Sequence, residues 1–201
     1  VDDKKNGIVK SYFPNGILES EVNYVDNKKN GIFKLYRENG KLWEERTYVD
    51  DKKNGIVKSY HENGQLCQEV NYVDDEKNGI FKLYHNGHNG QIYWEGKFVK
   101  NKRNGILKTY YNGILESEIN YIDDQRNGIY KIYYQNGQLW SEVNYIDGLK
   151  QGIYKSYHDN GNLESEVNYI DDIKNGIFKS YHYFGQLKEE VNYINDIKNG
   201  I

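Results

Sequence analysis

The chain has 201 residues, of which 37% are hydrophobic, 28% are charged and 15% are aromatic. That share of aromatic and β-branched residues excludes an intrinsically disordered chain. The formal net charge of −3 provides no basic field, so nucleic acid is not an expected partner. Cys67 is the only cysteine, which excludes an intrachain disulfide framework and a Cys-x-x-Cys metal site.

A glycine-centred unit recurs along the whole chain. One copy, NGIVKSYFPNGILESEVNYVDNKK, runs from Asn6 to Lys29, and the next copy follows at once. Self-similarity at a fixed period is the signature of a repeat protein. We therefore expect a single repeat array over residues 1–201, with units that start near residues 6, 30, 54, 78, 104, 127, 151 and 175.

Each unit contains two short segments that favour strands. In the first copy these are residues 8–12 and 18–25, separated by Asn15-Gly16, and a polar return turn is expected from Asp26 to Gly31. Strands of this length joined by short loops form an antiparallel meander. The predicted fold is all-β, an elongated antiparallel meander of about eight tandem β-hairpin repeats in a single-layer or half-rolled sheet.

Alternation along the strands sorts the side chains onto two faces. Leu18, Ser20, Val22 and Tyr24 share one side, and we place Val9 with them because its position is apolar or aromatic in every copy. This side is the predicted core. The opposite side carries a lysine at every position equivalent to residue 10 and a glutamate at every position equivalent to residue 21, which predicts a cross-strand ladder. The tyrosines equivalent to residue 12 are expected on this second side.

The histidines and carboxylates do not form a recognisable catalytic or metal-binding motif. Equivalent histidines in neighbouring units are expected about 9–10 Å apart, too far to share one zinc ion. Only His85 and His88 are close in sequence, and we interpret all five histidines as solvated turn residues. Every carboxylate has periodic copies, whereas acid–base catalysis needs two groups in different environments. We expect no enzyme activity, no metal and no cofactor.

The tryptophans and part of the tyrosine column are the candidate binding residues. Trp43 and Trp140 are expected on the glutamate-bearing face, and Trp94 lies in the irregular fourth unit. Exposed Trp and Tyr side chains are common anchors of binding surfaces. The alternative is that they only cover neighbouring strands. The complete candidate set is Trp43, Trp94, Trp140, Tyr36, Tyr60, Tyr133 and Tyr157.

The pattern NGIxKxYxxNGxLxxExNY, as found from Asn54 to Tyr72, resembles the MORN-variant repeat of many bacterial proteins. Some of those proteins are labelled antitoxin components of toxin–antitoxin systems. The pattern departs from the standard MORN motif, because Gly7-Ile8-Val9 lacks its Gly-x-Gly element. The resemblance implies β-hairpin repeats that make protein or membrane-surface contacts.

These observations favour a non-catalytic scaffold that mediates protein–protein interaction, at a bacterial surface or as a secreted factor. Peripheral binding to membrane lipid and a glycan-binding array are the alternatives. Lipid binding is not favoured, because the alternating lysine and glutamate columns leave no basic patch. The chain begins inside a turn and ends as another copy begins, so end-to-end self-association through uncapped edge strands is also expected.

Overall fold

The computed structural model describes residues 4–87 and 90–200, and His88 lies outside the described residues. The described residues form β-strands and turns, with no α-helix among them. Two compact units comprise residues 1–102 and 103–201. The expected all-β meander of hairpin repeats is confirmed, whereas the single array of eight units stays a prediction.

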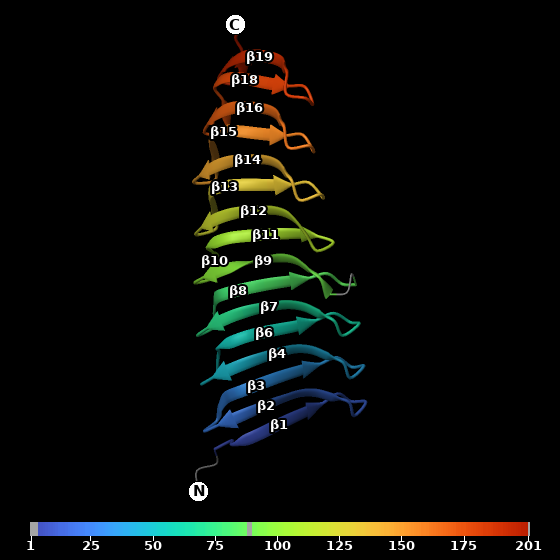
Figure 1. The fold of residues 1–201 in the computed structure, drawn as a ribbon. Coiled ribbons are helices and arrows are strands. Elements are labelled where there is room, and N and C mark those ends of the chain that lie inside the picture. Colours follow the sequence, from blue (N-terminus) through green and yellow to red (C-terminus); the bar gives the residue numbers. More distant parts are fainter. Residues whose placement is uncertain (1–3, 88–89, 201) are drawn as a thin grey trace. The chain divides into compact units, whose positions relative to one another are not determined.

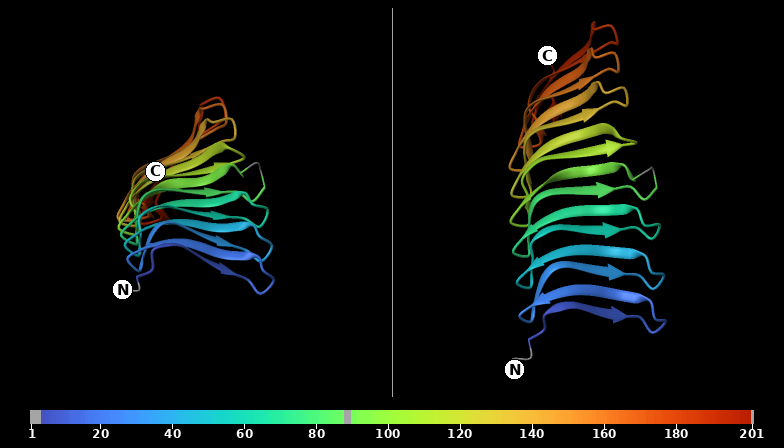
Figure 2. Two further views of the ribbon diagram at one scale, coloured as in Figure 1. Left: turned by 90° about the horizontal axis from the view of Figure 1, so that it is seen from below. Right: turned by 60° about the horizontal axis from the view of Figure 1, so that its bottom comes forward.

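Within each unit, successive strands lie side by side in chain order and every strand pair is antiparallel (Figure 1). The strands bend along their length, so the sheet is curved within each unit (Figure 2). The first unit contains β1 (Gly7–Tyr12), β2 (Leu18–Val25), β3 (Lys28–Tyr36), β4 (Leu42–Val49), β5 (Lys52–Lys53), β6 (Gly55–Tyr60), β7 (Leu66–Val73), β8 (Glu76–Tyr84) and β9 (Ile92–Val99).

The boundary between the units falls inside the two-residue strand β10 (Lys102–Arg103). The second unit continues with β11 (Gly105–Tyr111), β12 (Ile114–Ile122), β13 (Gln125–Tyr133), β14 (Leu139–Ile146), β15 (Leu149–Tyr157), β16 (Leu163–Ile170), β17 (Ile173–Lys174), β18 (Gly176–Tyr181), β19 (Leu187–Ile194) and β20 (Ile197–Lys198).

The return turn is shorter than the six residues expected from the sequence. Asp26 and Asn27 have φ values of 51° and 70°, and the next residue, Lys28, already pairs with Val25. Two consecutive residues with positive φ make a type I′ turn, whose twist matches that of the flanking strands. The prediction of a longer turn was wrong because Asn30-Gly31 also looks like a turn in the sequence.

Asn30-Gly31 instead forms an irregularity inside β3, where the register shifts between Val22 and Tyr24. Gly31 has a φ of 96°, and Asn23 Nδ2 donates a hydrogen bond to the Asn30 carbonyl oxygen at 2.9 Å. A β-bulge with a glycine in the left-handed region has this form. The Asn23 side chain thus supplies a hydrogen-bond donor for the backbone carbonyl oxygen at the bulge.

The longer turn at the other end of each hairpin has a different basis. The Gly16 N–H donates to the Phe13 carbonyl at 2.9 Å, the Phe13 N–H donates to Ile17 at 2.8 Å, and Gly16 has a φ of 82°. A second register shift follows, because Ser11 pairs with Ser20 whereas Tyr12 pairs with Leu18. This bulge carries Leu18 to the side of Tyr12, away from the side that simple alternation predicted.

The core lies on the face that contains the positions of Val9, Ser11, Ser20, Val22 and Tyr24, here called the valine face. Its buried hydrophobic residues are Val22, Tyr48, Val57, Val70 and Phe81 in the first unit, and Leu107, Ile119, Tyr121, Val143, Tyr145 and Val167 in the second. Serine hydroxyls pair within it, as in Ser156 Oγ and Ser165 Oγ at 2.8 Å. The predicted core stripe is therefore correct at the positions of Val9, Ser20, Val22 and Tyr24 and wrong at Leu18, which the bulge carries to the opposite face.

A cation covers the aromatic ring at the Tyr24 position of every repeat. Lys29 Nζ lies 5.4 Å from the centre of the Tyr48 ring, and Arg103 Cζ lies 4.3 Å from that of Tyr121. Such contacts contribute about 0.5–1 kcal/mol each at exposed sites. The long lysine and arginine side chains therefore cover part of a core that no second sheet covers within either unit.

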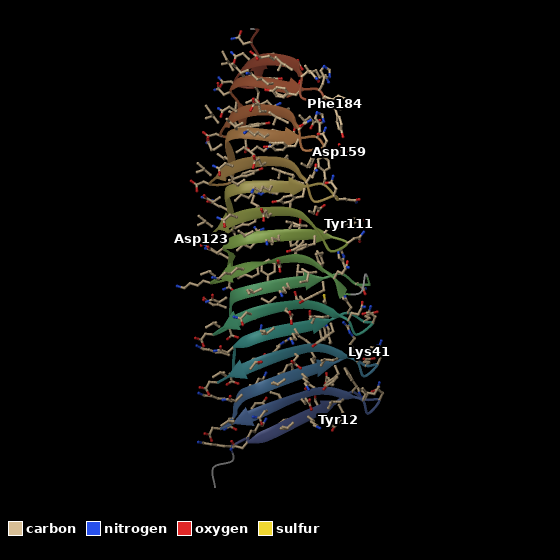
Figure 3. All side chains as sticks on the ribbon, viewed as in Figure 1. Tyr12, Lys41, Tyr111, Asp123, Asp159 and Phe184 are labelled. Carbon is tan, nitrogen blue, oxygen red and sulfur yellow. The ribbon has the colours of Figure 1, made fainter. Side chains whose placement is uncertain are left out.

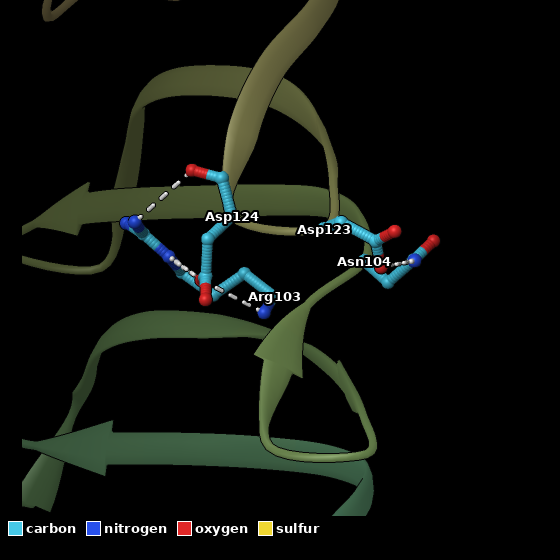
Figure 4. A network of polar contacts seen from close by, with 4 residues as sticks. All are labelled: Arg103, Asn104, Asp123 and Asp124. Atoms are coloured by element: carbon cyan, nitrogen blue, oxygen red, sulfur yellow. Dashed lines mark hydrogen bonds and ion pairs between the residues drawn. The ribbon is translucent and has the colours of Figure 1, made fainter.

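The second residue of each short turn is bonded to the preceding repeat. Asp51 donates its N–H to the Lys29 carbonyl at 3.0 Å, and its Oδ1 accepts the Lys29 N–H at 2.8 Å. Asp124 repeats this pattern with Arg103, whose Nε also donates to Asp124 Oδ1 at 2.8 Å (Figure 4). Aspartate and asparagine suit this position because both tolerate positive φ and supply an acceptor.

Gly148 holds this position in one repeat and retains only half of the pattern, its N–H donating to the Arg126 carbonyl at 2.9 Å. We expect Gly148→Asn to raise the free energy of unfolding by about 0.5–1.5 kcal/mol, because asparagine adds an acceptor for the Arg126 N–H and restricts the unfolded chain. Urea denaturation measures this. Gly137→Asn, at a φ of 84° in a longer turn, is the control. A Gly148→Asn variant no more stable than the control would contradict the explanation.

Candidate functional site

The face opposite the core contains the positions of Ile8, Lys10, Tyr12, Glu21 and Asn23, and is here called the isoleucine face. Ile8 pairs with Asn23 and Lys10 pairs with Glu21, so the predicted cross-strand register is confirmed. Each repeat contributes one isoleucine that is 49–68% exposed. This isoleucine stripe consists of Ile8, Ile32, Ile56 and Ile80 in the first unit, and Ile106, Ile129, Ile153 and Ile177 in the second.

The charges beside the isoleucine stripe compensate one another. Glu21 lies 3.9 Å from Lys10 Nζ and 3.6 Å from Lys34 Nζ, and Lys58 lies 3.7 Å from Glu69. The glutamates also accept a hydrogen bond from the tyrosine hydroxyl of the next repeat, as Tyr84 donates to Glu69 at 2.7 Å. Exposed pairs of this kind stabilise little, but they fix the register. The face thus has apolar groups exposed, and Lys10, Lys34, Lys58 and Lys179 of its lysine column lie within 4 Å of glutamates.

The same contacts alter the tyrosine pKa values. Burial, followed by the hydrogen bond to a glutamate, raises the pKa of Tyr133 and of Tyr157 to about 12. Their glutamate partners are Glu118 at 2.7 Å and Glu142 at 3.0 Å. Because the pKa in the folded state exceeds the value of 10.0 for an unperturbed tyrosine, the associated stability is complete below pH 10 and is lost as the pH rises toward 12.

We therefore expect the melting temperature of the second unit to fall between pH 10 and about pH 12. Thermal melting of the full chain followed by circular dichroism, at several pH values in this range, measures the slope. Tyr133→Phe/Tyr157→Phe removes both hydroxyls and is expected to melt with a shallower pH dependence. Equal slopes for the variant and the wild type would show that these hydroxyls do not carry the effect.

Shallow hollows recur along the isoleucine face within each unit. One of them, of about 440 Å³, is lined by Ile56, Glu69, Asn71, Ile80 and Lys82. A second one, of about 300 Å³, has the equivalent isoleucine, glutamate, asparagine and lysine side chains in the second unit. Repeated hollows of one composition offer an extended surface rather than one distinct chemical site.

The tryptophan positions differ from the expectation. Trp43 and Trp140 occupy the residue that the bulge leaves without a partner, so strict alternation fails there. Glu116, at the equivalent position, accepts a hydrogen bond from Thr109 Oγ1 at 3.2 Å, and Thr109 belongs to the valine face. Trp43 and Trp140 therefore lie at the valine-face side of the longer turns, not on the glutamate-bearing face.

Both tryptophans pack against the first residue of the longer turn. Arg37 Cζ lies 5.6 Å from the Trp43 ring, and the Tyr134 and Trp140 ring centres are 6.4 Å apart. Each tryptophan is nevertheless more than 40% exposed. Trp94 is also exposed and pairs with Leu83 at a serine position of the valine face.

The four candidate tyrosines belong to the isoleucine face. Tyr36 donates to Glu21 at 3.3 Å, and Tyr133 and Tyr157 make the glutamate bonds described above. Tyr60 is half-buried, and burial is the main cause of its raised pKa. The structure thus assigns the candidate tyrosines to one face and the candidate tryptophans to the other.

Histidines in the longer turns connect neighbouring repeats. His61 Nε2 lies 3.2 Å from the Tyr84 carbonyl oxygen, and His158 Nε2 lies 3.2 Å from that of Tyr181. Arg37 and Tyr134 make the equivalent bonds at 3.0 Å and 2.7 Å. Among residues 4–87 and 90–200, no three His, Cys, Asp or Glu side chains are grouped as a metal site requires.

Within each unit, the longer turns lie at one edge of the sheet and the shorter turns at the opposite edge (Figure 3). In the second unit Tyr111, Asp159 and Phe184 project at one edge and Asp123 at the other, whereas in the first unit Tyr12 and Lys41 mark the longer-turn edge (Figure 3). No described helix is long and apolar enough to span a membrane.

The isoleucine stripe was missed by reasoning from the sequence. Its signal is the Gly-Ile pair that opens every unit. Alternation along the first strand places Ile8 on the side of Lys10 and Tyr12, but the column was not counted among the candidate binding residues, because an isoleucine within a strand pattern normally indicates the core.

The repeated hairpins, their fixed register and their two chemically distinct faces define a tandem β-hairpin repeat protein. Six segments, residues 5–26, 29–50, 53–74, 126–147, 150–171 and 174–195, match the family described as MORN repeat variant. The chain belongs to this family. MORN repeats are generally modules for protein or membrane contacts.

The curated proteins contain no match to this chain. Solved structures similar to parts of it include the crystal structure of TarM and that of a mutant of S. aureus TarM in complex with Fondaparinux, alpha-GlcNAc-glycerol and UDP. Each is 16% identical with a TM-score of 0.34, and the matches cover 51% and 52% of this chain. The match spans only 20% of the length of either structure.

Proposed function

We propose that this chain is a non-catalytic scaffold that binds a protein partner along the isoleucine face. The observation that carries the proposal is the isoleucine stripe, an exposed apolar side chain at the same position in every repeat. Isolated exposed isoleucines are common on protein surfaces, but a contiguous apolar patch bordered by polar residues is typical of an interaction site.

The charges on this face support a protein rather than a lipid surface. Binding to anionic lipid depends on clustered, uncompensated lysine or arginine. Here Lys10, Lys34 and Lys58 lie within 4 Å of glutamates. A surface with exposed apolar groups and paired charges resembles a protein interface, in which an apolar centre is bordered by satisfied polar groups.

The hollows favour binding over catalysis. Each contains the same isoleucine, glutamate, asparagine and lysine types, so no carboxylate has an environment that would distinguish an acid from a base. The repetition offers many equivalent weak contacts along one partner, which is a common way for repeat proteins to use an extended surface.

In the first step of the test, the full wild-type chain and the Ile56→Thr/Ile80→Thr variant are used as bait in parallel pull-downs. Each protein that only the wild type retains is then purified, and its binding to both chains is measured. Threonine keeps the β-branched shape and the strand preference while removing apolar surface. We expect the dissociation constant, measured by calorimetry, to increase about tenfold or more in the variant.

Two further variants separate this surface from the turn edges. Phe184→Ser changes a side chain that is 79% exposed in a longer turn and is expected to leave binding unchanged. Trp43→Ala/Trp140→Ala tests the edge that the sequence favoured. Binding that survives the isoleucine exchange but is lost in the tryptophan variant would contradict the proposed surface.

A further inference from the structure

The residues that flank the short turns become more apolar within the second unit. In the first unit a valine and a lysine flank two of these turns, Val25–Lys28 and Val49–Lys52, and Val73 pairs with Glu76 at a third, so each pair has one charged member. In the second unit the same paired positions hold two aliphatic side chains in three consecutive repeats. The pairs are Ile146–Leu149, Ile170–Ile173 and Ile194–Ile197, here called the aliphatic patch.

All six side chains of the aliphatic patch are 40–70% exposed. Alternation along β16 places Ile170 on the same face as Asn168, which pairs with Ile153 of the isoleucine stripe. The patch therefore extends the stripe sideways to the turn edge. Three neighbouring hairpins supply it, so it is contiguous within the second unit.

The exchange of a lysine for an aliphatic residue beside the short turn also removes positive charge from this edge. In the first unit Lys4 Nζ lies 3.7 Å from Asp26, and Lys28 Nζ lies 3.9 Å from Asp50. The residue equivalent to Lys28 is Leu149 in the second unit, where the aspartate of the following repeat is Asp171. A lysine that compensates the turn aspartate is therefore replaced by a leucine.

Asp147 and Asp171 receive side-chain hydrogen bonds from neutral amides, Asn127 Nδ2 at 3.4 Å and Gln151 Nε2. These bonds leave both negative charges uncompensated. The nearby lysines are engaged elsewhere: Lys150 lies over the Tyr169 ring on the valine face, 5.0 Å from its centre. The aliphatic patch is thus bordered by acidic side chains at its turn edge.

We propose that the aliphatic patch binds a segment of a protein partner in which apolar side chains are flanked by lysine or arginine. The apolar side chains would cover the isoleucines and Leu149, and the basic ones would pair with Asp147 and Asp171, giving the charge complementarity that directs association. This inference rests on the proposed function and assigns it a partner chemistry. A negatively charged lipid surface would be repelled by the same aspartates.

The probe is a synthetic peptide of about eighteen leucine and lysine residues, long enough to form an amphipathic helix, and its control replaces every lysine with glutamate. Fluorescence anisotropy with the full chain measures both. We expect the leucine–lysine peptide to bind, with affinity that falls as salt is raised, and the glutamate peptide to bind about tenfold or more weakly.

Leu149→Lys/Ile173→Lys introduces the arrangement that the first unit already contains, so the scaffold is expected to tolerate it. This variant is expected to weaken binding of the leucine–lysine peptide about tenfold or more. The matched exchange Lys28→Leu/Lys52→Ile builds the equivalent patch in the first unit and is expected to add a second binding site. Asp147→Asn/Asp171→Asn tests the charges, since Asn195 already occupies this turn position.

No binding of the leucine–lysine peptide, or equal binding by wild type and Leu149→Lys/Ile173→Lys, would overturn the proposal. Patch-dependent binding to phosphatidylcholine vesicles in place of the peptide would overturn it in favour of lipid. A concentration-dependent dimer that Leu149→Lys/Ile173→Lys abolishes would show a second copy as the occupant. Each result leaves the isoleucine-stripe experiment to decide the proposed function separately.

Discussion

Replacement of Gly79 by alanine is expected to lower the free energy of unfolding by about 2–4 kcal/mol. Gly79 has a φ of 116°, a conformation that costs alanine free energy on its own. A Cβ atom added there would lie 2.7 Å from Asn71 Nδ2 and 3.1 Å from Asn71 Cβ. Asn71 would have to move, and its hydrogen bond to the Asn78 carbonyl would weaken or break.

Gly105→Ala is the matched control, because Gly105 also has a positive φ, 95°, but a Cβ added there meets no atom within 4 Å. It should lose only the backbone contribution of about 1–2 kcal/mol. The free energies of unfolding of both variants, measured by chemical denaturation, separate the cost of the positive φ from the cost of the steric clash with Asn71. Equal losses would show that Asn71 yields freely, and that the glycine is required only by its φ.

The strand pattern could be predicted because it depends on local alternation. Residues 18–25 were expected as a strand and form β2, and Lys10 pairs with Glu21 as the columns implied. In a repeat array the same residue pattern recurs in every copy, so each copy independently predicts the same strand register.

The bulges could not be predicted, because a glycine with positive φ serves a turn and a bulge equally well. Asn30-Gly31 was therefore assigned to a turn, although the chain reverses four residues earlier at Asp26-Asn27. The consequence extends to the candidate site. One unpaired residue at the other bulge breaks the alternation that had assigned Trp43 to the glutamate-bearing face.

The exposed isoleucines show a second limit of prediction from the sequence. Whether an apolar column is core or surface depends on what covers each face, which no spacing along the chain specifies. The lysine and arginine side chains that cover the valine face, such as Lys29 over Tyr48, have no counterpart over the isoleucine stripe in the contacts described above. Alternation could place these isoleucines opposite the predicted core, but their exposure is read from the structure.

Ile119→Ala is expected to lower the free energy of unfolding by about 2–4 kcal/mol. Ile119 is only 5% exposed on the valine face, between Leu107 of one neighbouring strand and Tyr130 of the other. Truncation removes buried methyl and methylene groups and leaves a cavity that paired strands on both sides cannot close easily. Ile129→Ala, on the opposite face and 54% exposed, is expected to change stability by less than about 0.5 kcal/mol.

Leu107→Ala, alone and together with Ile119→Ala, completes a double-mutant cycle, for which we expect a coupling energy of about 0.5–2 kcal/mol because the two residues are direct cross-strand partners. Hydrogen exchange adds a spatial test. Repeats contact mainly their neighbours, so amides of β11, β12 and β13 should lose the most protection while those of β18 and β19 retain theirs. Uniform loss across the second unit would instead mean that its repeats unfold as one cooperative body.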